Sequence, residues 1–174
     1  RNLIREYVTL NRGTVQDKGT TKIGSDNWIM AYVHVAHDCI IGNHTIFANG
    51  TTLAGHVTIQ DYAILGGFTM VHQFVVLGEN CFTGINTIVL KDIPPYVMSS
   101  GQPASPHGLN SEGLKRRGFA KETISELKRA YKLLYKSDLL FNDAKQQIKD
   151  MAQSSDELKT FSEFLENSQR GIIR

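Results

Sequence analysis

An apolar residue recurs at every sixth position between Ile23 and Val89. Stepping by six from Ile23 gives twelve positions, of which eleven are apolar and one is Thr83. The next residue is Gly or Ala at eight of these twelve positions. A period of six matches neither the helical period nor the two-residue alternation of a strand. It predicts short flat strands stacked into a solenoid, with an inward residue in each strand and a small residue for a tight corner.

Three such strands close a triangular prism, which predicts a coil of 18 residues and parallel pairing between successive coils about 4.7 to 4.9 Å apart. Residues 18 apart then lie above one another. His37, His56 and His72 leave remainders of 1, 2 and 0 on division by 18, so they are expected on one edge. The same edge is predicted to carry four further residues, namely His34, Asp38, Gly55 and Gln73.

Two kinds of chemistry could use an edge with three histidines. In acyl transfer, a neutral imidazole takes a hydroxyl proton while a backbone N–H, for example that of Gly55, holds the developing oxyanion. A zinc site is the alternative, and it needs imidazole nitrogens about 2.0 to 2.1 Å from the metal. His37 and His72 are expected two coils apart, roughly 10 Å at the usual strand spacing. One chain would not easily enclose zinc with these histidines, although a neighbouring subunit could add a ligand.

Composition sets the broad class of protein. The chain is 41% hydrophobic, and it has neither the long apolar stretch of a membrane-spanning helix nor a secretory leader, so a cytoplasmic protein is expected. Cys39 and Cys81 form no metal-binding pattern and are interpreted as buried thiols in a reducing compartment. A nucleic-acid partner is not expected, because the net charge is only +2 and the basic residues are not interleaved with aromatic ones.

The four prolines all lie between residues 94 and 106, and they are predicted to end the ladder of strands. We therefore predict a β-helix over residues 1–95, a proline-containing connection over 96–107 and an α-helical domain over 108–174. Amphipathic helices are expected near 121–137, 142–153 and 156–167. Residues 114–136 contain eight basic and two acidic residues, which indicates either an anionic partner or a solvated helix face.

Five segments in series resemble one family of enzymes. They are "VHVAHDC", "LAGHV", "VHQF", "DIPPYV" and "GLNSEGLKRRGF", and together they are similar to the bacterial UDP-N-acetylglucosamine O-acyltransferases of lipid A biosynthesis. These belong to the hexapeptide-repeat acyltransferases. The resemblance implies a mainly β fold, a left-handed parallel β-helix followed by a helical domain. It also implies that further coils precede Arg1 in family members, so that this chain corresponds to roughly their C-terminal two thirds.

The resemblance further implies an activity and the residues that perform it. A 3-hydroxyacyl chain would move from acyl carrier protein to the 3-hydroxyl of UDP-N-acetylglucosamine in a homotrimer with sites between subunits. No metal is implied, and no cofactor beyond the phosphopantetheine of the carrier. His37 would be the general base, Asp38 its orienting partner and Gly55 the oxyanion donor. The implied substrate-binding residues are His34, His56, His72, Gln73, Asn110, Glu112, Arg116 and Arg117.

One further residue carries a specific expectation about acyl length. Ile85 matches a position that resembles a ruler in this family, where a larger side chain closes the acyl groove. Asn11 departs from the family pattern, which has His there. Three alternatives stay open on the sequence: the related N-acyltransferase of the same pathway, a zinc hexapeptide-repeat carbonic anhydrase, and a non-catalytic scaffold that only trimerises.

Overall fold

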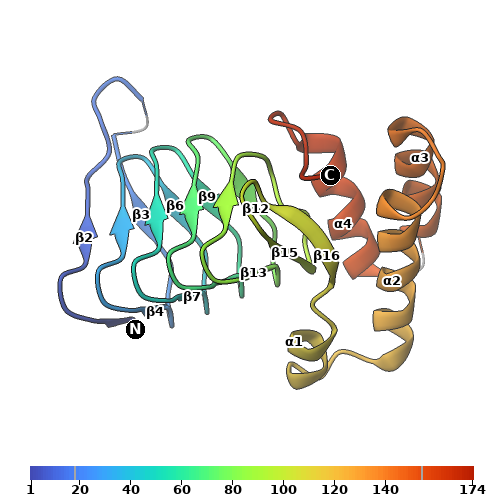
Figure 1. Cartoon of the computed structure of the whole chain (residues 1–174), viewed down its shortest axis with the longest axis horizontal. Helices are drawn as coiled ribbons and strands as arrows, with labels where there is room; N and C mark the ends of the chain where they lie inside the picture. The colour runs from blue at the N-terminus through green and yellow to red at the C-terminus, as the bar shows by residue number, and fades with distance from the viewer. Residues whose placement is uncertain (18, 154) are drawn as a thin grey trace.

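The protein is a parallel β-solenoid followed by helices (Figure 1), as seen in a computed structural model that describes residues 1–17, 19–153 and 155–174. The strands are β1 (Leu3–Ile4), β2 (Thr9–Leu10), β3 (Lys22–Ile23), β4 (Trp28–Ile29), β5 (His34–Val35), β6 (Ile40–Ile41), β7 (Ile46–Phe47), β8 (Thr52–Leu53), β9 (Thr58–Ile59), β10 (Ile64–Leu65), β11 (Met70–Val71), β12 (Val76–Leu77), β13 (Phe82–Thr83), β14 (Ile88–Val89), β15 (Val97–Ser100) and β16 (Ser105–Leu109). The helices are α1 (Ser111–Arg116), α2 (Lys121–Tyr135), α3 (Phe141–Met151) and α4 (Asp156–Asn167).

Three parallel sheets form the sides of the prism. Their strand orders are β1-β4-β7-β10-β13-β15-β16, β14-β11-β8-β5-β2 and β12-β9-β6-β3. Ile40 pairs with Lys22 on one side and Thr58 on the other, and the remaining coils after β3 keep the same spacing up to β14. The predicted coil of 18 residues is therefore confirmed.

The inward column predicted from the six-residue period is buried from Ile29 to Val89. A second inward column, two residues earlier in each strand unit, was not predicted from the sequence. It contains small apolar and polar residues such as Val33, Cys39 and Thr45, all completely buried. These positions lack a uniform hydrophobic signal because the space beside each corner accepts a short side chain, and Thr45 satisfies its hydroxyl with Asn27 at 2.7 Å.

The tight corners lie two residues later than the small residues that were predicted to form them. Asp38 and His56, the third residues after inward Val35 and Leu53, have φ values of 60° and 63°. The small residues are needed for another reason, namely close contact between coils. A Cβ on Gly42, for example, would lie 2.2 Å from the Asp61 carboxylate of the next coil.

A loop before β3 interrupts the regular coils. Thr9 pairs with His34, which is 25 residues away instead of 18, so the segment between β2 and β3 carries seven additional residues. Figure 1 shows this loop, in blue, projecting from one edge of the solenoid. It lies beside the edge on which the histidines were predicted.

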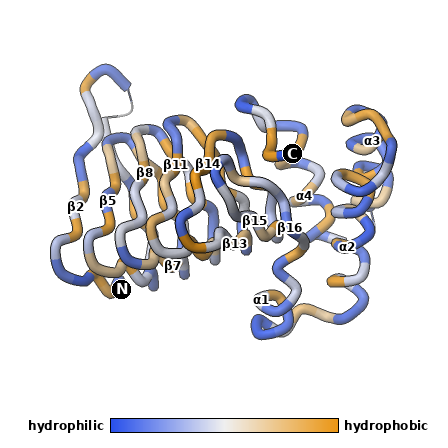
Figure 2. The backbone as a smooth tube through the Cα atoms, in the orientation of Figure 1, coloured by the Kyte–Doolittle hydropathy of each residue, from blue (hydrophilic) through white to orange (hydrophobic). Residues whose placement is uncertain are grey.

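The ladder of strands continues past Pro94 and Pro95. β15 pairs in parallel with β13, and β16 returns antiparallel to β15, so sheet structure occupies most of the predicted connection 96–107. Beyond it, α2, α3 and α4 lie where amphipathic helices were expected. Figure 2 shows hydrophobic and hydrophilic residues alternating along the helices, and the hydrophobic faces pack together in one core with the solenoid. No helix in the described part of the chain has the length and apolarity needed to cross a membrane.

Candidate active site

His37 and Asp38 form a hydrogen-bonded pair at the corner between β5 and β6. His37 Nδ1 lies 3.0 Å from Asp38 Oδ2. Consecutive residues in a strand would point to opposite faces, but the left-handed backbone of Asp38 turns both side chains to the same side. Aspartate tolerates this conformation better than most residues. The corner that the pairing required in the sequence is therefore present.

Asp38 is held by the projecting loop and is almost completely buried, at 1% exposure. Its two carboxylate oxygens accept the Thr14 N–H at 3.2 and 3.0 Å, and Oδ2 also accepts the Thr14 hydroxyl at 2.9 Å. Burial by itself raises the pKa of Asp38, but the hydrogen bonds from the Thr14 N–H, His37 and the Thr14 hydroxyl outweigh it and lower the pKa to about 2. Asp38 is thus a carboxylate at neutral pH. It accepts Nδ1–H of neutral His37 and leaves the Nε2 lone pair free.

Gly55 lies directly beside the His37 ring, one coil further along. A Cβ at Gly55 would be 2.6 Å from His37 Cε1 and 2.8 Å from Nε2, so only glycine allows the ring to lie where it does. The N–H of Gly55 has no acceptor among the described residues. At matching corner positions on another edge, side chains occupy the equivalent N–H groups, as when Asn43 N–H donates to Asp61 at 2.8 Å. The Gly55 N–H is therefore available beside the His37 imidazole.

His56 occupies the neighbouring corner position and contacts three groups. Its ring meets the His37 ring edge-on, with centroids 5.1 Å apart, and stacks on Phe74 at 4.5 Å. Its Nδ1 lies 2.9 Å from Asp17 Oδ2, in the projecting loop. The predicted meeting of His37 and His56 on one edge is therefore present in the structure.

His72, Gln73 and His34 lie around this pair of histidines. Gln73 stacks one coil beyond Gly55, as the 18-residue register requires. His72 Nδ1 lies 3.2 Å from the Gln73 carbonyl and 3.3 Å from the guanidinium of Arg170, which belongs to the segment after α4. His34 is on β5, with Nδ1 2.7 Å from the Thr9 hydroxyl.

The predicted nucleotide-binding residues lie on a different edge. Asn110 caps α1 by accepting the Gly113 N–H, and it donates to the Asn80 carbonyl at 3.0 Å. Glu112 pairs with Lys115 at 2.7 Å, and the C-terminal end of α1 carries exposed Arg116.

Arg117 follows α1, and its guanidinium lies over the Tyr62 ring, 3.0 Å from the centroid. Tyr62 and Asn80 belong to the corners that follow β9 and β12, one side of the prism away from His56. In Figure 1, α1 lies at the bottom of the solenoid, whereas the projecting loop lies at the top. One chain therefore does not bring Arg117 to His37.

Ile85 lies on the third edge, in the corner between β13 and β14. Its side chain belongs to a residue that is 73% exposed, and a Cβ on Gly67 would be 3.9 Å from Ile85 Cγ1. The predicted stacking of Ile85 next to Gly67 is present. Ile85 is thus separated from His37 within one chain, as Arg117 is.

Comparison with known proteins identifies the family of this fold and edge. Residues 92–173 match the model described as "Udp N-acetylglucosamine O-acyltransferase; Domain 2", and residues 20–55 match the bacterial transferase hexapeptide model. The acyl-[acyl-carrier-protein]–UDP-N-acetylglucosamine O-acyltransferase of Thiobacillus denitrificans is 57% identical over 173 residues, covering 99% of this chain and 67% of that protein. The chain belongs to the UDP-N-acetylglucosamine O-acyltransferase family.

Solved structures agree with this assignment. The Francisella novicida UDP-N-acetylglucosamine acyltransferase has a TM-score of 0.97 and 44% identity, covering 99% of this chain and 63% of that one. The Arabidopsis acyltransferase has a TM-score of 0.91 and 35% identity, covering 100% of this chain and 64% of that one. The chain thus spans about two thirds of the length of these acyltransferases. The solved relatives are left-handed β-helices, which confirms the predicted handedness.

The cluster of possible metal ligands in this O-acyltransferase is smaller than the histidine edge. Among the described residues, one group of at least three possible ligands is present, His37, Asp38 and His56, with ligand atoms within 4.8 Å of one another. His72 is not part of it. Tetrahedral zinc with bonds of 2.0 to 2.1 Å would need ligand atoms about 3.3 Å apart, and both Nδ1 atoms already contact carboxylates. The arrangement therefore suits an oriented base better than a metal centre.

Five residues at this edge were not predicted from the sequence. Thr14, Asp17 and Thr21 come from the region around the projecting loop, and Thr21 Oγ1 accepts the Asp38 N–H at 3.0 Å. Phe74 and Arg170 support His56 and His72 respectively. The signal for Phe74 was available, because residue 74 is 18 beyond His56. The loop residues fall outside the period, so column counting does not place them.

Proposed function

We propose that His37, Asp38 and Gly55 carry out the acyl transfer for which the family is named. The reaction moves a 3-hydroxyacyl chain from acyl carrier protein to the 3-hydroxyl of UDP-N-acetylglucosamine, the first step of lipid A biosynthesis. The observation that supports these roles is the His37–Asp38 hydrogen bond of 3.0 Å beside an unoccupied Gly55 N–H. A buried carboxylate, an imidazole with a free Nε2 and a backbone donor are the groups that acyl transfer requires.

The reaction follows from this geometry. His37 Nε2 removes the proton of the sugar 3-hydroxyl while the oxygen attacks the thioester carbonyl and forms the new C–O bond. The Gly55 N–H stabilises the oxyanion, and Asp38 stabilises the imidazolium. When the tetrahedral intermediate collapses, the C–S bond breaks and the imidazolium returns its proton to the phosphopantetheine thiolate. General base catalysis of this kind contributes about 10² to 10⁴-fold, and the carrier's phosphopantetheine is the one prosthetic group involved.

The remaining histidines are proposed to bind the substrates. His56, His72 and Gln73 line the cleft on the same edge as His37, and His34 presents its ring from β5. Imidazole and amide groups act here as hydrogen-bonding partners for sugar hydroxyls and pantetheine amides. This assignment agrees with the exposure of the His37 side chain, 44%, which leaves the edge open to a ligand.

The nucleotide is proposed to bind where α1 of one subunit meets the histidine edge of its neighbour. Asn110, Glu112, Arg116 and Arg117 would contact the nucleotide sugar or the phosphopantetheine arm, since guanidinium groups suit phosphate. They lie one prism side away from His37 within a chain, so a cyclic homotrimer is the arrangement that would unite them. Exposed aromatic residues on the edge of Ile85, Tyr32 at 63% and Phe68 at 58%, support contact between subunits there.

A mixing experiment tests the shared site. Chains carrying His37→Ala and chains carrying Arg117→Glu are assayed separately, then unfolded and refolded together. If each site takes His37 from one chain and Arg117 from the next, about a quarter of the sites in a random trimer contain both groups. Activity should therefore reappear in the mixture. If both groups acted within one chain, the mixture would show no more activity than the two variants alone.

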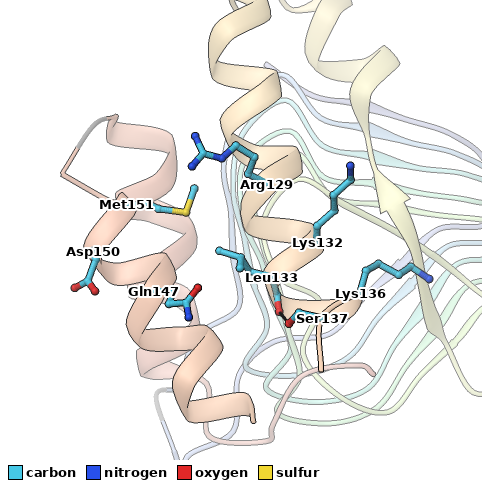
Figure 3. Close-up of a pocket in the computed structure, with 8 residues that line it drawn as sticks. All are labelled: Arg129, Lys132, Leu133, Lys136, Ser137, Gln147, Asp150 and Met151. Atoms are coloured by element: carbon cyan, nitrogen blue, oxygen red, sulfur yellow. Dashed lines mark hydrogen bonds between the residues drawn. The ribbon is translucent and has the colours of Figure 1, made fainter. Parts of the chain in front are cut away.

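The basic surface of α2 is proposed to dock the acidic acyl carrier protein. A pocket of about 510 Å³ lies between α2 and α3, and Figure 3 shows its lining residues. Arg129 faces Met151 across the pocket, while Lys132 and Lys136 extend from α2 on the side away from α3. These cations would steer an anionic partner in a salt-dependent way.

We also propose a cytoplasmic location. The described chain carries two free cysteines, Cys39 and Cys81, and burial raises the pKa of the Cys81 thiol to about 12. Free thiols are usual in a reducing compartment, and both proposed substrates belong to cytoplasmic biosynthesis.

An acyl-transfer assay with metal analysis tests the proposed function. The purified protein is incubated with 3-hydroxyacyl carrier protein and UDP-N-acetylglucosamine, and bound metal is measured in the same sample. Acylated sugar nucleotide without stoichiometric metal supports the proposal. His37→Ala should lower kcat by at least about 10²-fold without changing thermal unfolding, whereas His107→Ala, an exposed histidine on β16, should leave kcat unchanged. Stoichiometric zinc without transfer, or normal turnover by folded His37→Ala, would contradict it.

A further inference from the structure

The projecting loop contributes to the histidine edge at two points. Thr14 binds the Asp38 carboxylate through its N–H and its hydroxyl. Three residues later, the Asp17 N–H donates to the Thr14 carbonyl at 3.2 Å, which closes a turn. This turn directs the Asp17 carboxylate to His56. One loop therefore contacts both imidazoles of the edge, His37 through Asp38 and His56 through Asp17.

The two carboxylate–histidine pairs have the same hydrogen-bond pattern. Asp38 Oδ2 lies 3.0 Å from His37 Nδ1, and Asp17 Oδ2 lies 2.9 Å from His56 Nδ1. Neutral imidazole has one N–H and one acceptor nitrogen, and a carboxylate can only accept. Each pair therefore places the proton on Nδ1 and leaves Nε2 as an acceptor. Free histidine has no such partner to select this tautomer, so the carboxylates determine which nitrogen faces the ligand.

We propose that Asp17 is a positioning residue for His56. Asp17 holds the His56 ring with Nε2 as a hydrogen-bond acceptor for an O–H or N–H donor of the acyl-transfer substrates, beside the base His37. This inference rests on the proposed function. It assigns a role to the loop that interrupts the repeat, and it makes His56 an acceptor, not a donor, in the substrate cleft.

Packing around His56 supports orientation as the purpose of this pair. Phe74 stacks on one face of the ring at 4.5 Å, and His37 meets it edge-on. The His56 side chain is 19% exposed, and that of Asp17 is 41% exposed. A partly exposed ion pair contributes little to stability, typically about 0 to 1 kcal/mol. The Asp17 contact therefore matters for the direction and tautomer of the ring more than for the fold.

The test combines kinetics with ¹⁵N NMR of labelled histidine. Asp17→Asn offers an amide that can donate to Nδ1 and so selects the opposite tautomer. We expect the two nitrogen shifts of His56, assigned with a His56→Gln variant, to exchange their pattern in Asp17→Asn. We also expect kcat to fall about tenfold or more, comparable with the roughly 10 to 100-fold losses seen for carboxylates that orient metal-binding histidines. Asp17→Glu, which restores a carboxylate, should recover most of both signals.

A matched control comes from the same loop. Val15 is 96% exposed, so Val15→Ala should change neither the His56 shifts nor kcat. Unchanged His56 shifts in folded Asp17→Asn would overturn the role of Asp17, as would an unchanged kcat. The NMR measurement needs no turnover, so it is separate from the proposed function. Absence of acyl transfer by the unmodified protein would contradict that function, while an exchanged tautomer in Asp17→Asn would still establish the contact.

Discussion

Replacing Gly55 with alanine should move the catalytic base without disturbing the fold. The added Cβ would lie 2.6 Å from His37 Cε1, whereas ordinary contacts begin at about 3.4 Å, so the imidazole has to move by 3.4 − 2.6 = 0.8 Å. Gly55 has no left-handed φ, so alanine fits its backbone. Displacement of a reacting group by about 1 Å can lower the rate about 10²-fold. This corresponds to about 2.7 kcal/mol of transition-state stabilisation at 1.36 kcal/mol per decade.

The assay measures kcat/KM for transfer to UDP-N-acetylglucosamine and compares it with thermal unfolding. Gly67→Ala serves as the stability control, since Gly67 occupies the same turn position on another edge and its Cβ would meet its nearest atom at 3.4 Å. Both variants should unfold near the parent temperature, because the His37 side chain is partly exposed and can yield. A Gly55→Ala protein with parental kcat/KM would refute the assignment of His37 as a base positioned by this contact.

Three further changes have defined outcomes. Reversing the charges of Arg116 and Arg117 should raise KM and weaken carrier binding most at low salt, and unchanged binding at low salt would show that they are solvated surface. Ile85→Gly should improve activity with longer hydroxyacyl donors by roughly 5 to 150-fold, from about 1 to 3 kcal/mol of relieved crowding, and an unaltered chain-length profile would exclude a ruler at Ile85. Burial raises the pKa of Asp92 and outweighs its hydrogen bonds, so the folded state holds this proton more tightly than the unfolded state. The free energy of unfolding then falls as pH rises above about 4, and urea titrations should find a flatter dependence in Asp92→Asn.

The period of six accounts for most of the solenoid. It predicts the inward column, the 18-residue coil and the common edge of His37 and His56, because every coil repeats one geometry and register is a matter of counting. It does not locate the second inward column, where side chains as different as Val33 and Thr45 share one environment. It also cannot show that β15 continues the ladder after Pro94, since that strand pairs outside the six-residue spacing.

The site was predictable to the extent that it obeys the same count. Asp38 and Gly55 follow from the columns and from the family motif, and the structure places both beside His37. Thr14 and Asp17 follow from neither. They belong to the segment whose seven additional residues fall outside the coil, so their positions depend on how the loop folds back over the edge. Polar residues in such an interruption are therefore good candidates for site residues even where counting cannot assign them.

The three edges of the prism divide the work of the enzyme among different chains. His37 lies on one edge, Ile85 on the second and Tyr62, with Arg117 stacked on it, on the third. Parallel stacking makes each edge a straight column, so no bend within the solenoid can bring these columns together. A cyclic assembly places one edge of a subunit against a different edge of its neighbour, because heterologous contacts repeat around the axis. Base, acyl-length determinant and phosphate-binding groups can therefore meet only across subunits, which makes assembly a condition for catalysis as well as for stability.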